Sequence, residues 1–118
     1  MATYYVWSGA GGANNGTSWT DAYTSFDSAV TAATTNGDII KVHKAHAGAI
    51  TATTTYTFGA HVRVICVDKD NADALAEMDG STGYLGNTTT TYFLTINGAY
   101  NVYFYGIAFR FGGTGNTN

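Results

Sequence analysis

The sequence predicts an all-β fold in which one N-terminal helix is followed by short strands that wind into a solenoid. The composition favours strands and tight turns, because 20 Thr and 9 Tyr suit pleated surfaces, while 15 Gly and 9 Asn suit turns and proline is absent. From Asp38 onward, runs with strand-like alternation follow one another with few residues between them. Bends such as Gly106 leave too few residues to reverse the chain, so successive strands are expected on different sheets.

Short connections are also typical of hairpins, and therefore of an antiparallel sandwich. The turns argue against that alternative, since most of them lack an Asn-Gly or Asp-Gly pair between runs of equal length. Asn97 and Gly98 come closest. The segment 98–101, between Ile96 and Val102, is nevertheless interpreted as a bend that redirects the chain.

The N-terminal part contains the one helix that the sequence predicts. A first strand over residues 3–9 and a Gly/Asn-rich loop precede it. Within residues 18–38, apolar side chains recur with the 3.6-residue period of a helix at Ala22, Phe26, Ala29, Val30 and Ala33. Ser18 or Thr20 is placed to cap this helix, and Gly37 to end it. The narrow, alanine-rich stripe predicts a helix that lies close on the end or flank of a sheet.

The rest of the chain is expected to form strands. The predicted strands cover residues 38–45, 50–59, 61–68, 88–98 and 101–112. The 69–87 segment departs from this pattern. Its apolar residues Ala72, Leu75, Ala76 and Met78 fit one short helical turn, and the remainder is expected to be loop.

Two segments resemble a known family. Residues 4–46 combine a strand, an Asn/Gly-rich loop, an amphipathic helix and the start "GDIIKV", and residues 92–113 contain "NVYFYGIAF" after a bend at Asn101. Both are similar to proteins of the pectate-lyase-like superfamily. The resemblance implies a right-handed single-stranded parallel β-helix of about three coils with an N-terminal capping helix. It also implies a single domain, with the strand, loop and cap in residues 1–37 and the coils in 38–118, as the start of a longer solenoid.

Charge and hydropathy exclude several classes of partner. The net charge is −3 and the five Lys and Arg are scattered, so no basic surface for nucleic acid is expected. No apolar run approaches the ~20 residues that span a bilayer, and the N-terminus does not have the regions of a signal peptide. Cys66, the only cysteine, alternates with Val62 and Val64 and is expected to be a small buried hydrophobe rather than a reactive thiol.

Polar side chains that could carry chemistry gather in two places. Five of the eight acids lie at Asp68, Asp70, Asp73, Glu77 and Asp79. This run lacks the sixth-position Gly and twelfth-position Glu of a calcium-binding loop, so a solvated acidic loop is predicted. His43, Lys44, His46 and His61 match no metal or catalytic motif. The sequence therefore predicts no catalytic, cofactor-binding or metal-binding residues.

Aromatic residues supply the candidate contact surface. The residues predicted to form an interface or to touch a glycan are Tyr4, Tyr5, Trp7, Trp19, Tyr100 and Tyr103. The four N-terminal rings could stack on sugars, but packing of the helix against the first coil, or a subunit contact, is the favoured interpretation.

The expected function is structural. The helix would cap one end of the solenoid, so the other end requires either more chain or another subunit. With the low charge, no catalytic set and no expected signal peptide, this favours a surface component of a tailed-bacteriophage virion, made in the host cytoplasm. Capsid decoration, tail spike and fibre are the candidate roles.

The resemblance implies a homotrimer that assembles with other virion proteins, and a host surface glycan is a further candidate partner. The alternatives are the N-terminal part of a polysaccharide lyase or glycoside hydrolase, and a glycan-binding adhesin.

Overall fold

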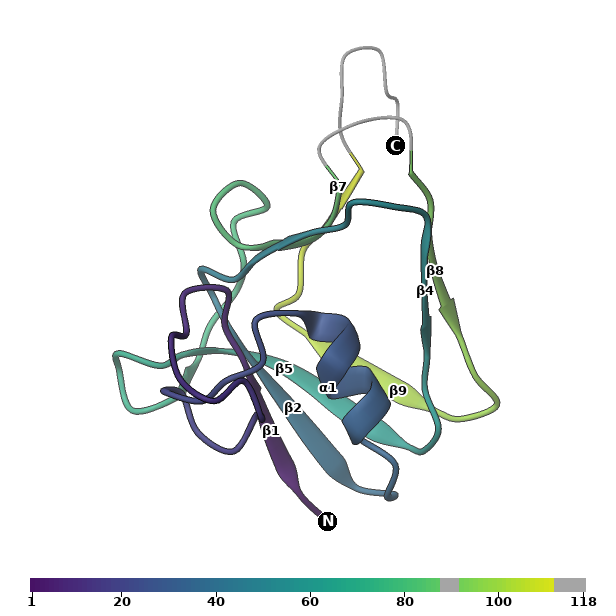
Figure 1. Ribbon diagram of the computed structural model, residues 1–118, viewed down its shortest axis with the longest axis horizontal. Coiled ribbons are helices and arrows are strands. Elements are labelled where there is room, and N and C mark those ends of the chain that lie inside the picture. Colours follow the sequence, from purple (N-terminus) through teal and green to yellow (C-terminus); the bar gives the residue numbers. More distant parts are fainter. Residues whose placement is uncertain (88–91, 112–118) are drawn as a thin grey trace.

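The computed structural model describes residues 1–87 and 92–111, and these are mostly β with one short helix. The elements in chain order are β1 (Thr3–Val6), α1 (Phe26–Ala32), β2 (Asp38–His43), β3 (Ala47–Ala49), β4 (Thr54–Thr57), β5 (Val62–Asp68), β6 (Ala74–Leu75), β7 (Tyr84–Asn87), β8 (Leu94–Asn97), β9 (Val102–Tyr105) and β10 (Phe109–Phe111). The helix lies beside the sheet that contains β1, β2, β5 and β9 (Figure 1).

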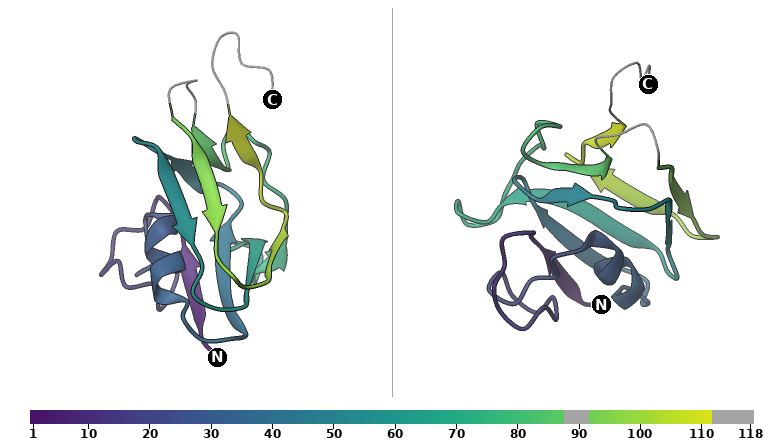
Figure 2. Two further views of the ribbon diagram at one scale, coloured as in Figure 1. Left: turned by 90° about the vertical axis from the view of Figure 1, so that its right-hand side faces the viewer. Right: turned by 45° about the horizontal axis from the view of Figure 1, so that its top comes forward.

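The strands of the described residues form three separate sheets. The first has the order β1-β2-β5, with β9 and β6 both pairing β5; the second has the order β10-β7-β3; the third consists of β4 and β8. All of these pairs are parallel except β5 with β6. From β2 onward, successive strands lie on different sheets, as expected, apart from β5 and β6; β1 and β2 share the first sheet. The strands β8, β9 and β10 lie on the side of the molecule away from β1 and α1 (Figure 2).

The structure contradicts the predicted fold class, a right-handed single-stranded parallel β-helix of about three coils. The described strands form short, separate sheets and do not close into a continuous helix. The physical cause lies after β5, where the chain turns back into antiparallel β6 through Ala72 and Asp73, both with positive φ. Strand β9 consequently pairs with residues 62–65 of β5 only. The coarser expectation, mostly strands with a single N-terminal helix, is confirmed.

The helix is shorter than the sequence predicts. The apolar stripe of Ala22, Phe26, Ala29, Val30 and Ala33 is buried, as expected. The helix nevertheless begins only at Phe26, because Tyr23 forms a parallel bridge with Val6 and is held in extended backbone. Ser18 does not cap it: its hydroxyl accepts the N–H of Asp21 in the preceding loop, and Ser25 occupies the cap position instead.

Two further predictions of local structure are wrong. The 69–87 segment has no helical turn at Ala72–Met78 but carries β6 and β7. The predicted strand over 50–59 is observed only as β4, while β3 forms earlier, where Gly48 and two alanines gave no strand signal. Residues 88–91 and 112, at the ends of two predicted strands, lie outside the described residues. Within the described residues, no helix has the length and apolar character needed to cross a membrane.

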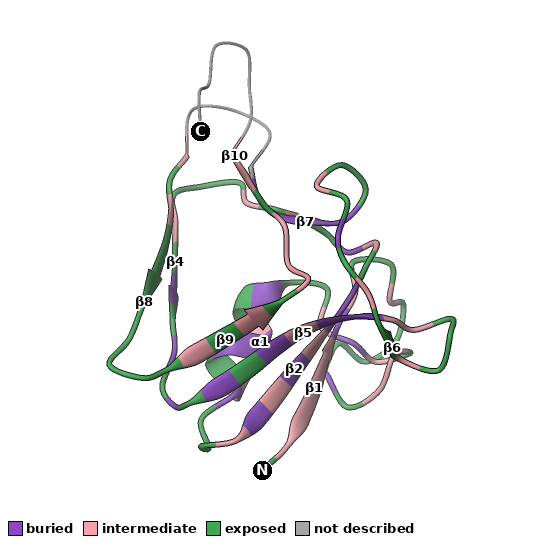
Figure 3. Ribbon diagram, turned by 180° about the vertical axis from the view of Figure 1, so that it is seen from behind, coloured by how far each residue is buried: buried purple, intermediate pink, exposed green. Residues whose placement is uncertain are grey.

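The core lies between the three sheets and the helix. Alternate residues of β2 and β5, such as Ile40, Val42 and Val64, are buried in this core. Figure 3 shows buried stretches along both strands. Aromatic rings continue this core in edge-to-face contacts. Phe58 contacts Phe26 of the helix at a centroid distance of 6.5 Å and Phe104 of β9 at 6.1 Å. One ring therefore links the first helix to the last strand of the first sheet.

Candidate functional site

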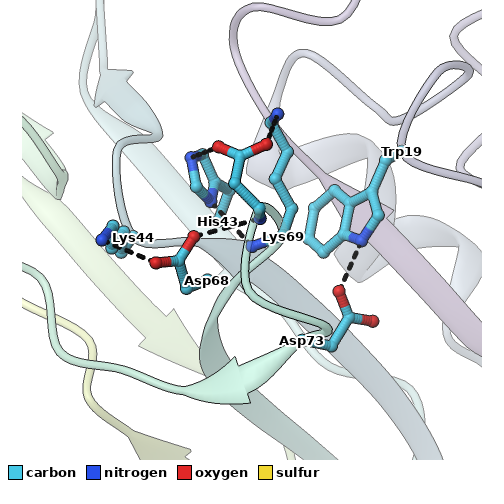
Figure 4. A network of polar contacts seen from close by, with 7 residues as sticks. Trp19, His43, Lys44, Asp68, Lys69 and Asp73 are labelled. Atoms are coloured by element: carbon cyan, nitrogen blue, oxygen red, sulfur yellow. Dashed lines mark hydrogen bonds and ion pairs between the residues drawn. The ribbon is translucent and has the colours of Figure 1, made fainter.

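Aromatic and charged side chains meet on the outer face of the first sheet, towards the carboxyl ends of β1, β2 and β5. The parallel register places Tyr5 beside Lys41, and Lys41 beside Ile65, so that all three side chains share this face. We call the following eight residues the aromatic–ionic cluster: Tyr5, Trp7, Trp19, Lys41, His43, Lys69, Asp70 and Asp73. Figure 4 labels Trp19, His43, Lys69 and Asp73 of this cluster.

The Asp73 side chain connects the turn after β5 to the first sheet through hydrogen bonds. The indole N–H of Trp19 donates to Asp73 Oδ1 at 2.7 Å (Figure 4). Lys41 Nζ donates to Asp73 Oδ2 at 2.9 Å. The Lys41 and Asp73 side chains are each 24% exposed. The Asp73 carboxylate thus accepts one hydrogen bond from the N-terminal loop and another from β2. From the sequence, the polar segment that contains Asp73 was expected to be a solvated loop.

The Tyr5 and Trp7 rings of the cluster each have a lysine ammonium over one face. Lys69 Nζ lies 4.1 Å from the centroid of the Trp7 ring, and Lys41 Nζ lies 5.7 Å from that of Tyr5. Trp19 packs edge-on against Tyr5, with 4.9 Å between the ring centroids. Cations over ring faces are attracted by the π electrons, and they occupy the space that a stacked sugar would need. The arrangement therefore favours packing within the chain over an open sugar-stacking surface.

The other three predicted contact residues lie elsewhere. Tyr4 points to the opposite side of β1 and packs against Tyr23 and the core. Tyr100 is exposed and meets the ring of His61 edge-on. Tyr103 is exposed on β9. The structure thus brings together Tyr5, Trp7 and Trp19, and separates them from these three.

His43 joins the cluster as a buried, neutral side chain. Its Nδ1 accepts the backbone N–H of Lys69 at 3.3 Å, and its Nε2 lies 3.9 Å from Asp70 Oδ2. Burial lowers the pKa of His43, so that the imidazole is uncharged at neutral pH. Both Trp7 and Trp19 contact this ring edge-on. The histidine therefore acts as a hydrogen-bond acceptor that holds the start of the turn.

Asp68 and Asp79 have partners that explain them structurally. Lys44 Nζ lies 2.7 Å from Asp68 Oδ2, and this hydrogen bond lowers the pKa of Asp68. Asp79 accepts backbone N–H groups of residues 81–83, which lowers its pKa as well. Among the described residues, no group of three or more His, Cys, Asp or Glu is arranged to hold a metal ion. Cys66 is fully buried, as predicted, and burial raises its pKa to about 11.

His46 forms a second polar site that the sequence did not reveal. The side chain is completely buried, and within the described part of the chain neither ring nitrogen has a hydrogen-bond partner. It lies at the wall of a cavity of about 220 Å³ between the segment before α1, β3 and the start of β4. Burial lowers the pKa of His46 to about 4, with repulsion from His43 as a smaller cause.

We expect the free energy of unfolding to fall as the pH is lowered from about 6.5 to about 4. In this window the unfolded chain protonates His46, whose pKa is then near 6.5, whereas burial keeps the folded side chain neutral. The difference corresponds to about 3 kcal/mol. His43 and the cavity residue Asp27 are the titratable neighbours. Urea unfolding between pH 7 and 4 measures the effect, and a His46→Gln variant with the same pH dependence would contradict its assignment to His46.

Replacing Asp73 by alanine is expected to lower the free energy of unfolding by about 1–2 kcal/mol, because Trp19 and Lys41 lose a charged partner. Amide hydrogen exchange in residues 69–76 should accelerate. The matched control is Asp70→Ala, whose side chain is 69% exposed and whose loss should change stability by less than about 0.5 kcal/mol. Equal effects of the two substitutions would show that Asp73 does not fasten the turn.

Comparison of the chain with protein-family models, curated protein sequences and solved structures finds no match in any of the three. The resemblance to the pectate-lyase-like superfamily accordingly stays a prediction from the sequence.

Proposed function

We propose that this chain is a structural protein that acts by assembly and docking, as a surface-exposed component of a tailed-bacteriophage virion. Capsid decoration and tail spike or fibre are the roles we consider, with other virion proteins and further copies of the chain as partners. The virion location rests on the sequence, whose low charge and abundance of Thr, Gly and Asn suit an extended β surface. The mode of action rests on the edges of the three sheets.

The observation that carries the assembly role is the group of edge strands β8, β9 and β10. Each is the last strand of its sheet, and no further strand among the described residues pairs with it. These strands and the residues beside them expose apolar side chains: Phe93, Ile96, Tyr103, Tyr105 and Phe109. Edge strands that carry apolar side chains are templates for pairing with another strand.

The backbone of β9 shows what a partner would bind. The N–H of Val62 donates to the C=O of Asn101, and alternate residues of a parallel strand bond to the same neighbour. The main-chain groups of Val102 and Phe104 therefore point away from β5. Tyr103 is 69% exposed and Tyr105 47% exposed on the outer face. A strand added at this edge would gain backbone hydrogen bonds and cover part of both rings.

The contacts of the acidic residues support assembly over catalysis. Asp68, Asp73 and Asp79 bond to lysines, an indole or backbone N–H groups, and so stabilise turns. Homotrimer formation is our proposal for the assembly state, and it rests on the sequence resemblance.

The test introduces positive charge on the edge strand β9. The double variant Tyr103→Lys/Tyr105→Lys should weaken self-association at least about ten-fold, because aromatic residues at interfaces carry much of the binding energy and lysine discourages edge pairing. The control Thr31→Lys/Thr34→Lys adds the same charge at exposed positions in and after α1. Analytical ultracentrifugation measures the association constant. Equal association of both variants, each still folded by circular dichroism, would overturn the proposal.

A further inference from the structure

Asparagine followed by glycine occurs at residues 15–16, 36–37 and 97–98 of this chain. An asparagine in such a pair can modify itself, because the backbone nitrogen of the glycine can attack Cγ of the preceding side chain and close a five-membered ring. Glycine favours this reaction, since it has no side chain that shields its nitrogen. All three asparagines are exposed, so access of solvent to the side chain does not distinguish the pairs. Their hydrogen bonds do distinguish them.

The second pair is held by the backbone of His61. Gly37 N–H donates to the C=O of His61 at 2.9 Å, and Asn36 Oδ1 accepts the N–H of His61 at 3.0 Å. The glycine nitrogen and the carboxamide are therefore both engaged. Both hydrogen bonds must open before this nitrogen can approach Cγ, and such local opening is rare in well-paired backbone.

The first pair is held within the N-terminal loop. Gly16 N–H donates to the C=O of Asp21 at 2.8 Å, and Asn15 Oδ1 accepts the backbone N–H of Thr17 at 3.1 Å. Gly16 is also buried, and a Cβ at this position would strike the ring of Tyr23. The structure therefore restrains both reacting groups of this pair as well.

The third pair lacks these restraints. Gly98 N–H donates to Oδ1 of Asn97 itself at 2.8 Å, and it has no backbone acceptor among the described residues. Strand geometry explains this orientation. Phe58 N–H donates to the C=O of Asn97, and alternation along a parallel strand turns the next N–H away from β4. The Gly98 nitrogen therefore already lies against the carboxamide that it would attack.

Exposure of the glycine favours this pair further. Gly98 is exposed, whereas Gly16 is buried and Gly37 is half-buried. Gly98 follows Asn97, the last residue of β8, so rotation about the Cβ–Cγ bond of Asn97 can turn the carboxamide carbon towards the nitrogen without breaking a hydrogen bond between strands. Holding two reacting groups in contact before they react is a large source of rate acceleration.

We propose that Asn97 is a site of spontaneous modification, at which asparagine is converted into aspartate or isoaspartate. The Gly98 nitrogen gives its proton to water and bonds to Asn97 Cγ, and the side-chain nitrogen takes up a proton and leaves as ammonia. Water then opens the five-membered imide. Opening at Cγ gives aspartate, and opening at the backbone carbonyl carbon gives isoaspartate, in which the chain runs through Cγ. The net reaction consumes one water and releases one ammonia.

The modified residue stands at the end of the pairing between β4 and β8. Isoaspartate adds one carbon to the backbone of β8, and this displaces the C=O that accepts the N–H of Phe58 at 3.0 Å. Amide hydrogen exchange at Phe58 should therefore accelerate in the isoaspartate form. It should stay unchanged in the variant Asn97→Asp, which carries the new charge on a normal backbone.

Peptide mapping by mass spectrometry tests the proposal on the whole chain. Each modified peptide gains the mass difference between a hydroxyl and an amino group. In the folded chain at neutral pH, Asn97 should react at least about ten-fold faster than Asn15 and Asn36, because only its reacting groups are in contact. In the chain unfolded by urea, the three asparagines should react at similar rates, since each is followed by glycine.

Three results would overturn the proposal. The first is equal rates at the three asparagines of the folded chain, or a faster rate at either of the other two. The second is a preference for Asn97 that persists unchanged in urea, because the cause would then be the local sequence. The third is unchanged exchange at Phe58 in the isoaspartate form.

The inference does not depend on the assembly role, because the reaction involves one chain only. The mapping is repeated on the Tyr103→Lys/Tyr105→Lys variant, with sedimentation of the same samples. Slow reaction of Asn97 in the original chain and fast reaction in this variant would support the proposal and show that assembly covers β8. Slow reaction in both would overturn this inference alone, while the sedimentation reports the assembly role separately.

Discussion

Replacing Phe58 by alanine is expected to lower the free energy of unfolding by about 3–5 kcal/mol, the range for deleting a buried phenylalanine ring. The side chain is 1% exposed and contacts Phe26 of α1 and Phe104 of β9. Its removal leaves a cavity in the middle of the aromatic chain, so both the helix and the last strand of the first sheet lose support. For a domain of this size the loss is a large fraction of total stability.

Urea unfolding followed by circular dichroism measures this effect. The matched control is Leu75→Ala, since Leu75 is 64% exposed and lies outside the edge strands β8, β9 and β10, so its loss should change stability by less than about 0.5 kcal/mol. Unfolding midpoints that fall equally for the two variants would mean that Phe58 does not link the helix to β9.

Substituting Gly106 by alanine is expected to cost about 3 kcal/mol, because two unfavourable effects add. The first is conformational, since Gly106 has φ +68° in the left-handed region. The second is steric, since a Cβ there would strike the carbonyl oxygen of Ala76 and press on Cys66. Met78 N–H also donates to the carbonyl of Gly106 at 2.8 Å, so displacement of this bend disturbs the 69–87 segment.

Gly59→Ala serves as the control for this substitution. A Cβ at position 59 meets no atom within 4 Å, and φ there lies outside the left-handed region. This variant should be neutral or more stable by about 0.4–1 kcal/mol, because alanine restricts the unfolded chain. If thermal unfolding shows Gly106→Ala to be as stable as Gly59→Ala, the described bend beneath the 69–87 segment is wrong.

The sequence predicts what local periodicity determines. Alternation placed Cys66 inward in β5, and the 3.6-residue period identified Phe26, Ala29 and Val30 as the buried face of the helix. The beginning of the helix could not be predicted, because it depends on a bridge between Tyr23 and Val6, which are distant in sequence.

The turn after β5 shows a second limit. Ala72 and Asp73 adopt positive φ without being glycine, so composition gives no sign of the reversal that forms β6. That unforeseen reversal separates the observed sheets from the predicted coils. Similarly, the grouping of Asp73 with Trp19 and Lys41 follows from the register of β1 with β2 and from this turn. No sequence motif indicates that register or that turn.

The aromatic–ionic cluster and the His46 site differ in how clearly the sequence indicates them. The aromatic character of Tyr5, Trp7 and Trp19 marks them in the sequence as candidate contact residues. The structure groups these three side chains, although lysines cover the faces of Tyr5 and Trp7. His46 stands in a run of small residues and gains its character only from burial beside a cavity. Burial and the absence of a partner are properties of packing, so sequence patterns alone do not reveal them.

The central claim is that this protein functions by assembly through the edges of its sheets. Native mass spectrometry tests it most directly, because the chain has a mass of 12.4 kDa. The account predicts a discrete complex with three times the mass of the chain that dissociates when Tyr103 and Tyr105 are replaced by lysine. A mass equal to one chain at every concentration, unchanged by the same substitutions, would contradict it.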